Sequence, residues 1–561
     1  MGSWGEQMIR IVHIPWKCVA CHCWKIFRSV SALLILVFQV GCGDFANQTA
    51  YWYQSHYILV HKDGQAIPPP DKAALLKDPS GSLDVNEPLS TQQLRNQLEA
   101  VLKPGIDRFV ANLPSACSNQ LKILIIVHGG MNGYQQSSDH MVKLLRPPLS
   151  VPDVPNIAVP QELSNYEEPP PVNDTCYYPI FLNWDSDLGD ALADDLIRIR
   201  FGQKHRILAP VTAPFVVVGR VLGSIANLFP SLVANGLTVA DAYKGAGEEG
   251  DPLAARLGDA GLYFPVQALY TVSIPFGEGF GAPAWGMLKR RVDQVVASGL
   301  TPERNGNQGA GRTLFEQLRS WMSVDDQRNW HWNGASNPPV SISLVGHSMG
   351  TMILNRLLEV VEDHTTPGKH VSLPIESIIY LAPASSINEA DSLLLPFLER
   401  NTDTKFWLFI LNRRDESREI SLKGSTFIFP RGSLLTWIDT FLETETGPGQ
   451  ATMGWLKNLS AYYSTAPYSS QKTTFSEYFS PAPTAIPTGP ESSWRELHDI
   501  DWRISNQRGR LVTYVSKRRV WMPPTPAPEE HGDFLSPLVF RGILCMVDRT
   551  AFWQNSEFCS K

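Results

Sequence analysis

The chain reads Val340-Ser341-Ile342-Ser343-Leu344-Val345-Gly346-His347-Ser348-Met349-Gly350 over the stretch that decides its fold. The first part is apolar or small and short enough for a buried strand, and the residues through Glu362 carry apolar side chains at helical spacing. Ser348 therefore stands at a strand-to-helix corner with a glycine two residues away on each side. A sharp corner with a side chain at its apex requires small neighbours. The stretch predicts that Ser348 is a nucleophile; the alternative is an ordinary helix start with Ser348 near its cap.

A second stretch, Leu121–Val127, is a nearly continuous aliphatic run and indicates a strand of a parallel sheet that is covered on both faces. It breaks into His128-Gly129-Gly130-Met131. Glycines allow a backbone to approach a substrate oxygen closely, so this loop is a candidate oxyanion loop. An ordinary glycine turn with a packed histidine is the alternative. We assign His128 to holding the loop and not to proton transfer.

The remaining elements near the start of the chain are scaffold. Residues 51–61 alternate aromatic and aliphatic side chains before Asp63-Gly64, which predicts a hairpin strand. Ser90 followed by Gln93 predicts a capping box at the start of a helix.

Gly346-x-Ser348-x-Gly350 between a strand and a helix, with a His-Gly-Gly loop upstream, resembles the α/β-hydrolase superfamily, lipase and esterase branch. The resemblance covers roughly residues 120–545, and its motifs are specific for the fold and weak for the substrate. It implies an α/β-hydrolase fold, with a mostly parallel central sheet flanked by helices. It also implies an oxyanion hole built from backbone N–H groups of Met349 and of Gly130 and Met131.

The resemblance also places the other two members of a catalytic triad, because the usual chain order is serine, acid, histidine. The strand at residues 405–412 is followed by Asp415, the first choice for the acid, with Glu416 and Glu419 as alternatives. The base is expected in the loop after the last strand, where His531 precedes a glycine. His498 is the second choice, and His347 is expected to point away from the serine.

Residues 186–300 are predicted to form a helical cap or lid insertion. Within them, residues 207–237 are apolar apart from Arg220 and are interrupted by Pro210, Pro214 and Pro230. Three prolines and a charge disfavour a membrane span, and the two remaining interpretations are a lid that shields a pocket or meets lipid and a pair of core helices. Other proline-rich stretches, such as residues 147–171 and 481–490, are predicted loops.

The N-terminus resembles an export signal. A positively charged segment is followed by an apolar run that is too short to cross a bilayer, so residues 1–41 are a predicted signal peptide and residues 42–561 the hydrolase domain. Val40-Gly41-Cys42 resembles a bacterial lipoprotein processing site, with lipidation expected at Cys42; Gln39 departs from that pattern. Cys18, Cys21 and Cys23 lie inside the predicted signal, which disfavours a zinc site.

Four cysteines follow Cys42, and an even number in an exported chain suggests disulfides. The simplest pairing joins Cys117 to Cys176 and Cys545 to Cys559. Other pairings or free thiols stay open.

Composition narrows the function class. The chain has 561 residues, 43% of them hydrophobic, and a net charge of -7 without long runs of one sign. No electrostatic footprint for nucleic acid is present. The resemblance to the α/β-hydrolase superfamily implies a serine hydrolase that acts on a carboxylic ester, with a lipid or other apolar acyl group, and that needs no metal or organic cofactor. It is expected to be exported as a periplasmic or outer-membrane lipoprotein or to be secreted, with the membrane surface as a partner. The competing hypothesis is a non-catalytic envelope lipoprotein that uses the fold as a scaffold.

Overall fold

The computed structural model describes residues 56–67, 88–113, 115–117, 119–130, 137, 144, 175–200, 203–204, 208–226, 277–299, 306–334, 336–362, 372–411, 416, 433–443, 450–463, 494–497, 510–516 and 531–548. Residues 1–44 separate from residues 45–561 as a compact unit of their own. The predicted signal peptide and Cys42 lie in that unit and outside the described residues.

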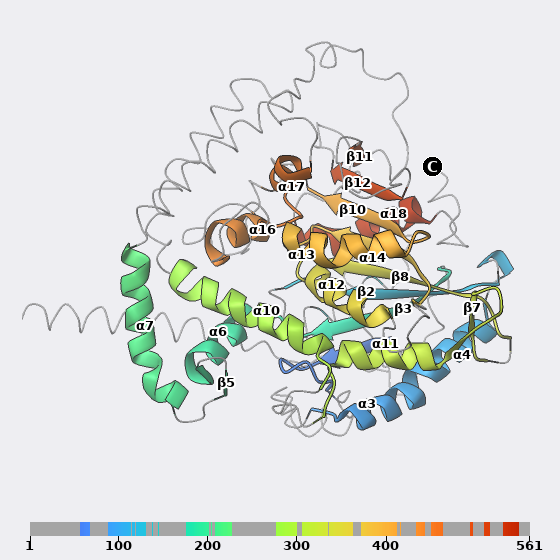
Figure 1. Cartoon of the computed structure of the whole chain (residues 1–561), viewed down its shortest axis with the longest axis horizontal. Helices are drawn as coiled ribbons and strands as arrows, with labels where there is room; N and C mark the ends of the chain where they lie inside the picture. Colours follow the sequence, from blue (N-terminus) through green and yellow to red (C-terminus); the bar gives the residue numbers. More distant parts are fainter. Residues whose placement is uncertain are drawn as a thin grey trace, which may run out of the picture. The chain divides into compact units, whose positions relative to one another are not determined.

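An eight-stranded sheet forms the centre of the second unit (Figure 1). Its strands, in spatial order, are β1 (Tyr57–Val60), β3 (Tyr177–Trp184), β2 (Leu121–Val127), β8 (Val340–His347), β9 (Ile375–Leu381), β10 (Lys405–Ile410), β12 (Leu511–Ser516) and β11 (Trp494–Leu497). All neighbours pair in parallel except β11, which is antiparallel to β12. The predicted α/β class with a mostly parallel sheet is therefore confirmed.

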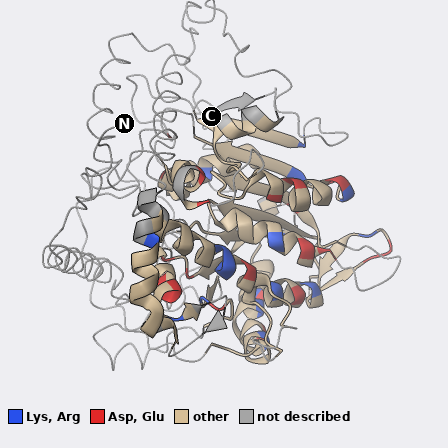
Figure 2. Cartoon of the chain, turned by 60° about the vertical axis from the view of Figure 1, so that its left-hand side comes forward, with Lys and Arg blue, Asp and Glu red and all other residues tan. Residues whose placement is uncertain are grey.

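The aliphatic runs explain the centre of the sheet. Every residue of β2, β3 and β8 is buried, as expected for strands that carry helices on both faces. Lys122 is the charged exception in β2, and its Nζ lies 2.6 Å from Asp548 Oδ2 at the end of the last helix. Charged side chains otherwise gather on the surrounding helices and loops, as Figure 2 shows.

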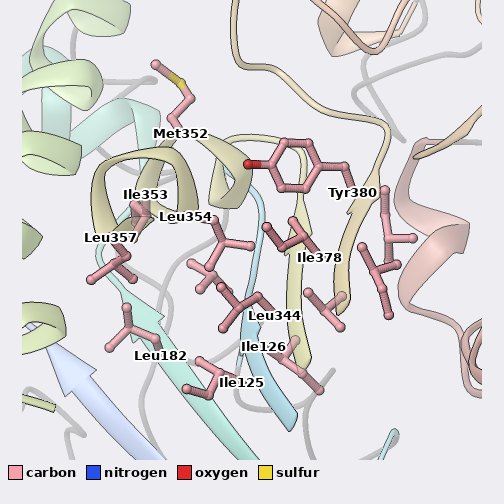
Figure 3. Close-up of a cluster of buried hydrophobic side chains, with 14 of the residues drawn as sticks. Ile125, Ile126, Leu182, Leu344, Met352, Ile353, Leu354, Leu357, Ile378 and Tyr380 are labelled. Atoms are coloured by element: carbon pink, nitrogen blue, oxygen red, sulfur yellow. The ribbon is translucent and has the colours of Figure 1, made fainter. Parts of the chain in front are cut away.

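Helices cover both faces of the sheet. On one face α12 (Gly350–Val361) packs on β8 and β2, with α10 (Ala282–Val296) and α11 (Ala310–Ser320) beside it. Figure 3 shows apolar side chains of α12 meeting those of the strands, among them Leu354, Leu344 and Ile378. On the other face Leu124 and Phe181 line a small apolar cavity with Phe540 and Leu544 of α18 (Pro537–Val547).

The remaining elements lie around this frame. They are α3 (Thr91–Gln97), the π-helical turn Leu98–Leu102, α4 (Lys103–Ala111), α6 (Leu188–Ile197), α7 (Leu208–Ala226), the π-helical turn Gly277–Gly281, α13 (Ile387–Glu389), the π-helical turn Ala390–Leu394, α14 (Leu395–Arg400), α16 (Leu434–Trp437), the π-helical turn Ile438–Leu442 and α17 (Leu456–Tyr463). Short 3-10 turns cover Ser115–Cys117 and His531–Leu535, and two small ribbons pair β4 (Ile199–Arg200) with β5 (Gln203–Lys204) and β6 (Met322–Val324) with β7 (Trp330–Trp332).

The strand order contains a switch point between β2 and β8. The chain moves from β2 to β3 on one side of it, and later from β8 to β9 on the other side. In open α/β sheets a ligand binds in the crevice outside the carboxyl ends of the strands at such a point. The register aligns Val127 with Gly346, so the predicted oxyanion loop and Ser348 leave the sheet side by side at the switch point.

The predicted cap, residues 186–300, contains α6, α7 and α10. Of these, α10 belongs to the helices that cover the sheet, because it packs against α11 and α12 and buries Trp285 and Leu288 in the main core. α7 packs instead against α6 and the π-helical turn Gly277–Gly281. Residues 227–276 lie outside the described part of the chain.

Candidate active site

Ser348 occupies a strained backbone conformation. Its φ is +51°, in the left-handed region that side chains other than glycine rarely adopt. Its N–H donates to the Leu381 carbonyl at 2.9 Å, and its own carbonyl accepts from Thr351 Oγ1 at 2.7 Å and from the Ala384 N–H at 3.1 Å. These contacts with β9 and α12 hold the strained corner in place. Strain of this kind, when the surroundings enforce it, is concentrated at functional sites.

The two glycines of the motif are required by space. A Cβ on Gly346 would lie 2.9 Å from Leu354 Cδ1 and 3.0 Å from Thr351 Cα. A Cβ on Gly350 would lie 2.2 Å from the carbonyl oxygen of Val127. The first contact is with the helix that follows the corner and the second is with the neighbouring strand. Crowding of strand and helix, the reason given for these glycines from sequence, is thus present in the structure.

The loop after β2 lies against the serine corner. A Cβ on Gly129 would stand 2.7 Å from the Cβ of Ser348, and one on Gly130 would stand 2.3 Å from Sδ of Met349. Glycine at both positions therefore lets this backbone approach the corner. Met131, the other predicted oxyanion residue, lies outside the described residues.

His128 anchors this loop to the end of β3. Its Nε2 accepts a hydrogen bond from the Trp184 N–H at 3.1 Å, and its carbonyl accepts from the Trp184 indole N–H at 3.0 Å. Because Nε2 is an acceptor, Nδ1 is the protonated nitrogen and donates to the Gly129 carbonyl at 2.6 Å. Ser186 Oγ donates to the same carbonyl at 3.2 Å. His128 holds the loop, as the sequence suggested.

The 3-10 turn after β12 carries His531 to the same corner. The His531 ring is buried, and its centroid lies 4.9 Å from that of His347, the residue before the serine. Burial, and then the neighbouring His347, hold the pKa of His531 well below its usual value. Among the described residues no group forms a hydrogen bond with Ser348 Oγ, and Ser348 is 1% exposed.

Of the three candidate acids, the structure describes only Glu416. Asp415 and Glu419 lie outside the described residues, whereas Glu416 is completely buried beyond the end of β10. The Glu416 carboxylate accepts a hydrogen bond from Ser433 Oγ, and its carbonyl accepts from the Ser433 N–H at 2.7 Å. No sequence signal indicated Ser433, which follows Glu416 by seventeen residues. His498, the second choice for the base, also lies outside the described part.

No family model, curated protein or solved structure matches this chain. The site is therefore interpreted from its own geometry and chemistry.

A buried ionic cluster lies at the carboxyl end of β3, between α6 and α10. Arg291 of α10 donates to Asp194 Oδ2 at 2.9 Å. It also donates at 3.2 Å to the carbonyl of Asp185, the residue that directly follows β3. Burial raises the pKa of both Asp185 and Asp194, and Arg291 opposes that rise. Burial, and then the charge of Asp185, raises the pKa of Asp190 to about 6. Arg291 and Asp185 are 106 residues apart in the sequence, so no local pattern indicated that they are partners.

The cysteines of the described residues are disulfide-bonded. Cys117 and Cys176, one of the two predicted pairs, form a disulfide that ties the approach to β2 to the start of β3. Cys545 is also disulfide-bonded, and its expected partner Cys559 lies outside the described residues.

Within the described ranges no group of three or more His, Cys, Asp or Glu side chains could hold a metal ion. Nor does any helix described there have the length and apolar character to span a membrane.

Proposed function

We propose that the protein is a serine hydrolase of the α/β-hydrolase superfamily that cleaves a carboxylic ester. The observation that carries the proposal is the left-handed Ser348 at the switch point of the sheet, with His531 beside the same corner. A strained serine flanked by two sterically required glycines costs stability, and strain of this kind is concentrated at functional sites. The sequence order of serine, acid loop and late histidine adds independent support.

In the proposed reaction Ser348 Oγ attacks the ester carbonyl carbon, and His531 accepts the serine proton. The carbonyl oxygen becomes an oxyanion, which backbone N–H groups of Met349 and of Gly130 and Met131 stabilise. His531 then returns the proton to the departing alcohol, and an acyl-serine remains. Water, activated by the same histidine, releases the acid and restores Ser348.

The acid that orients His531 is Asp415, Glu416 or Glu419. Asp415 is favoured by its place in the sequence. Glu416 is favoured by complete burial and by its contact with Ser433, since a buried carboxylate needs donors to be retained. Replacing each carboxylate by its amide distinguishes the candidates. The variant that lacks the true partner of imidazole Nδ1 should lose several orders of magnitude in kcat, and the other variants should not.

An apolar stripe on α7 supports a membrane surface as partner. Leu208, Val211, Phe215 and Val218 recur at spacings of three and four, so they share one helix face. All four are exposed, and Phe215 reaches 78% exposure. With the predicted export and Cys42 lipidation, this stripe favours an apolar acyl substrate at an interface.

The stripe is tested by site-specific photo-crosslinking in the full chain mixed with anionic phospholipid vesicles. A benzophenone amino acid replaces Phe215, and the matched control replaces Val324, an exposed apolar residue of β6. Lipid adducts well above the control are expected at position 215. Equal labelling at the two positions, or adducts only within the protein, would refute the membrane contact.

One observation favours the competing function, a non-catalytic envelope lipoprotein. Ser348 is almost completely buried, and no described group is hydrogen-bonded to its Oγ. A site that had lost its chemistry could keep the fold in this form.

The deciding experiment is hydrolysis of short p-nitrophenyl esters by the native chain, by Ser348→Ala and by Ser341→Ala. Ser341 lies in β8, the strand that leads to Ser348, and is also buried, so it controls for the substitution itself. The hydrolase predicts a loss on the order of 10⁴-fold or more in kcat for Ser348→Ala and little change for Ser341→Ala. Hydrolysis no faster than the buffer background in all three proteins would favour the scaffold function, and equal rates above background would show that Ser348 is not the nucleophile.

A further inference from the structure

His347 stands where three loops of the candidate site meet. It is the last residue of β8, is buried, and precedes Ser348. Its ring lies between the loop after β2, the serine corner and the 3-10 turn that carries His531. A histidine beside a serine is usually no more than a packed core residue, so the contacts of each ring nitrogen decide its role.

The Nε2 atom of His347 contacts the backbone of the candidate base. It lies 2.9 Å from the carbonyl oxygen of His531. A carbonyl can only accept a hydrogen bond, so His347 carries a proton on Nε2 and donates it. The contact spans 184 residues of sequence and joins the carboxyl end of β8 to the turn after β12.

The opposite side of the His347 ring faces the loop after β2. A Cβ added to Gly129 would stand 2.7 Å from His347 Nδ1. The ring therefore fills the space between Gly129 and His531. On its remaining flank the His347 ring lies 6.3 Å from the ring of Phe534, which is fully buried.

We propose that His347 is a positioning residue for the base: its Nε2–H holds the His531 carbonyl, and its ring sets the spacing between the base turn and the candidate oxyanion loop. The inference rests on the proposed hydrolase function. It assigns no proton transfer to His347, because Nε2–H is committed to the carbonyl. It explains why a histidine, and not merely a bulky apolar residue, precedes the serine.

The position of the His531 ring matters because a proton moves from serine to histidine only when the two side chains are within hydrogen-bonding distance. His531 must accept a proton from Ser348 Oγ at about 2.6–3.2 Å. A displacement of about 1 Å can cost on the order of a hundredfold in rate, with little effect on substrate binding. Loss of the carbonyl contact is therefore expected to lower kcat and to leave KM almost unchanged.

The test compares His347→Leu with His347→Gln in the full chain. Leucine keeps bulk but has no donor, whereas glutamine places a side-chain N–H₂ near the former Nε2 position. The assay measures p-nitrophenyl ester hydrolysis per serine titrated with a fluorophosphonate probe, so unfolded protein is not counted. Amide hydrogen exchange over residues 531–535 reports the base turn without requiring activity.

The proposal predicts a tenfold to hundredfold fall in kcat at nearly constant KM, and faster exchange over residues 531–535, for His347→Leu. His347→Gln is expected to restore most of both. Equal kcat per titrated serine in the native chain and the leucine variant would overturn the positioning role, as would equal losses in the two variants. A native chain whose Ser348 accepts no probe would instead overturn the hydrolase function, and the positioning role with it.

Discussion

Replacing Gly350 by alanine should destabilise the protein even though the same change elsewhere in a helix stabilises it. The new Cβ would stand 2.2 Å from the Val127 carbonyl oxygen and 2.7 Å from that of His128. Ordinary carbon–oxygen contact begins at about 3.3 Å, so α12 and β2 must separate by roughly 1 Å. Both partners are backbone of the central core, and neither can rotate away.

The size of the effect follows from two opposing terms. Overpacking of a rigid core costs about 1–3 kcal/mol and occasionally more, and backbone against backbone belongs at the upper end. Alanine in place of glycine in a helix returns about 1 kcal/mol. The free energy of unfolding should therefore fall by about 2 kcal/mol or more. Because α12 begins at the serine corner, Ser348 should also react more slowly with a fluorophosphonate.

Gly286→Ala is the matched control. Gly286 lies inside α10, is exposed, and a Cβ there would meet nothing within 4 Å. This variant should gain about 0.5–1 kcal/mol and keep the native labelling rate. Urea unfolding followed by tryptophan fluorescence measures both variants. A Gly350→Ala protein as stable as Gly286→Ala would refute the steric account of the motif.

Three further predictions concern buried charge. Arg291→Met removes the cation from Asp194 and its neighbours, and urea unfolding should show a loss of about 3–5 kcal/mol; a loss below 1 kcal/mol would mean that the carboxylates are not ionised. Ser433→Ala removes a donor to the buried Glu416 and should cost about 1–3 kcal/mol by the same method, whereas no loss would show that this contact is unimportant. Because the pKa of His531 is held below its ordinary 6.5, the base stays neutral at lower pH, and the acidic limb of kcat/KM should lie below pH 6.5. A limb above pH 6.5 would contradict the lowered pKa of this histidine.

The centre of the fold could be predicted from local patterns. The aliphatic run at residues 121–127 is β2, and the stretch from Val340 through the serine corner is β8 followed by α12. The capping box of Ser90 and Gln93 is also confirmed. In each case the information lies within a few residues, because burial on both faces and a helix N-terminus impose short-range patterns.

Other features depended on distant parts of the chain. The strand predicted before Asp63-Gly64 is β1, and an antiparallel bridge joins Val60 to Ala66 across the turn, but the sequence did not indicate that β1 pairs in parallel with β3. The Arg291–Asp194 pair spans 97 residues, and the His347–His531 contact spans 184. No spacing rule connects such residues, since the sheet brings them together only when it is complete.

Some residues of the candidate site could be predicted from local sequence, and others depend on distant parts of the chain. The corner serine and its glycines could be recognised because their requirement is local and steric. Ser433 could not, because a lone serine carries no sign of the carboxylate that it meets. The acid itself depends on an orientation toward His531 that sequence position alone does not determine, so Asp415, Glu416 and Glu419 all stay candidates.

The proposed hydrolase function requires Ser348 to be an activated nucleophile. Its most direct test is the mass of the peptide containing Ser348 after the full chain reacts with a fluorophosphonate. Activation by His531 predicts one probe per protein on Ser348, none on Ser341, and a rate that falls sharply in His531→Gln. A Ser348 peptide of unchanged mass, or a labelling rate that does not depend on His531, would contradict the account.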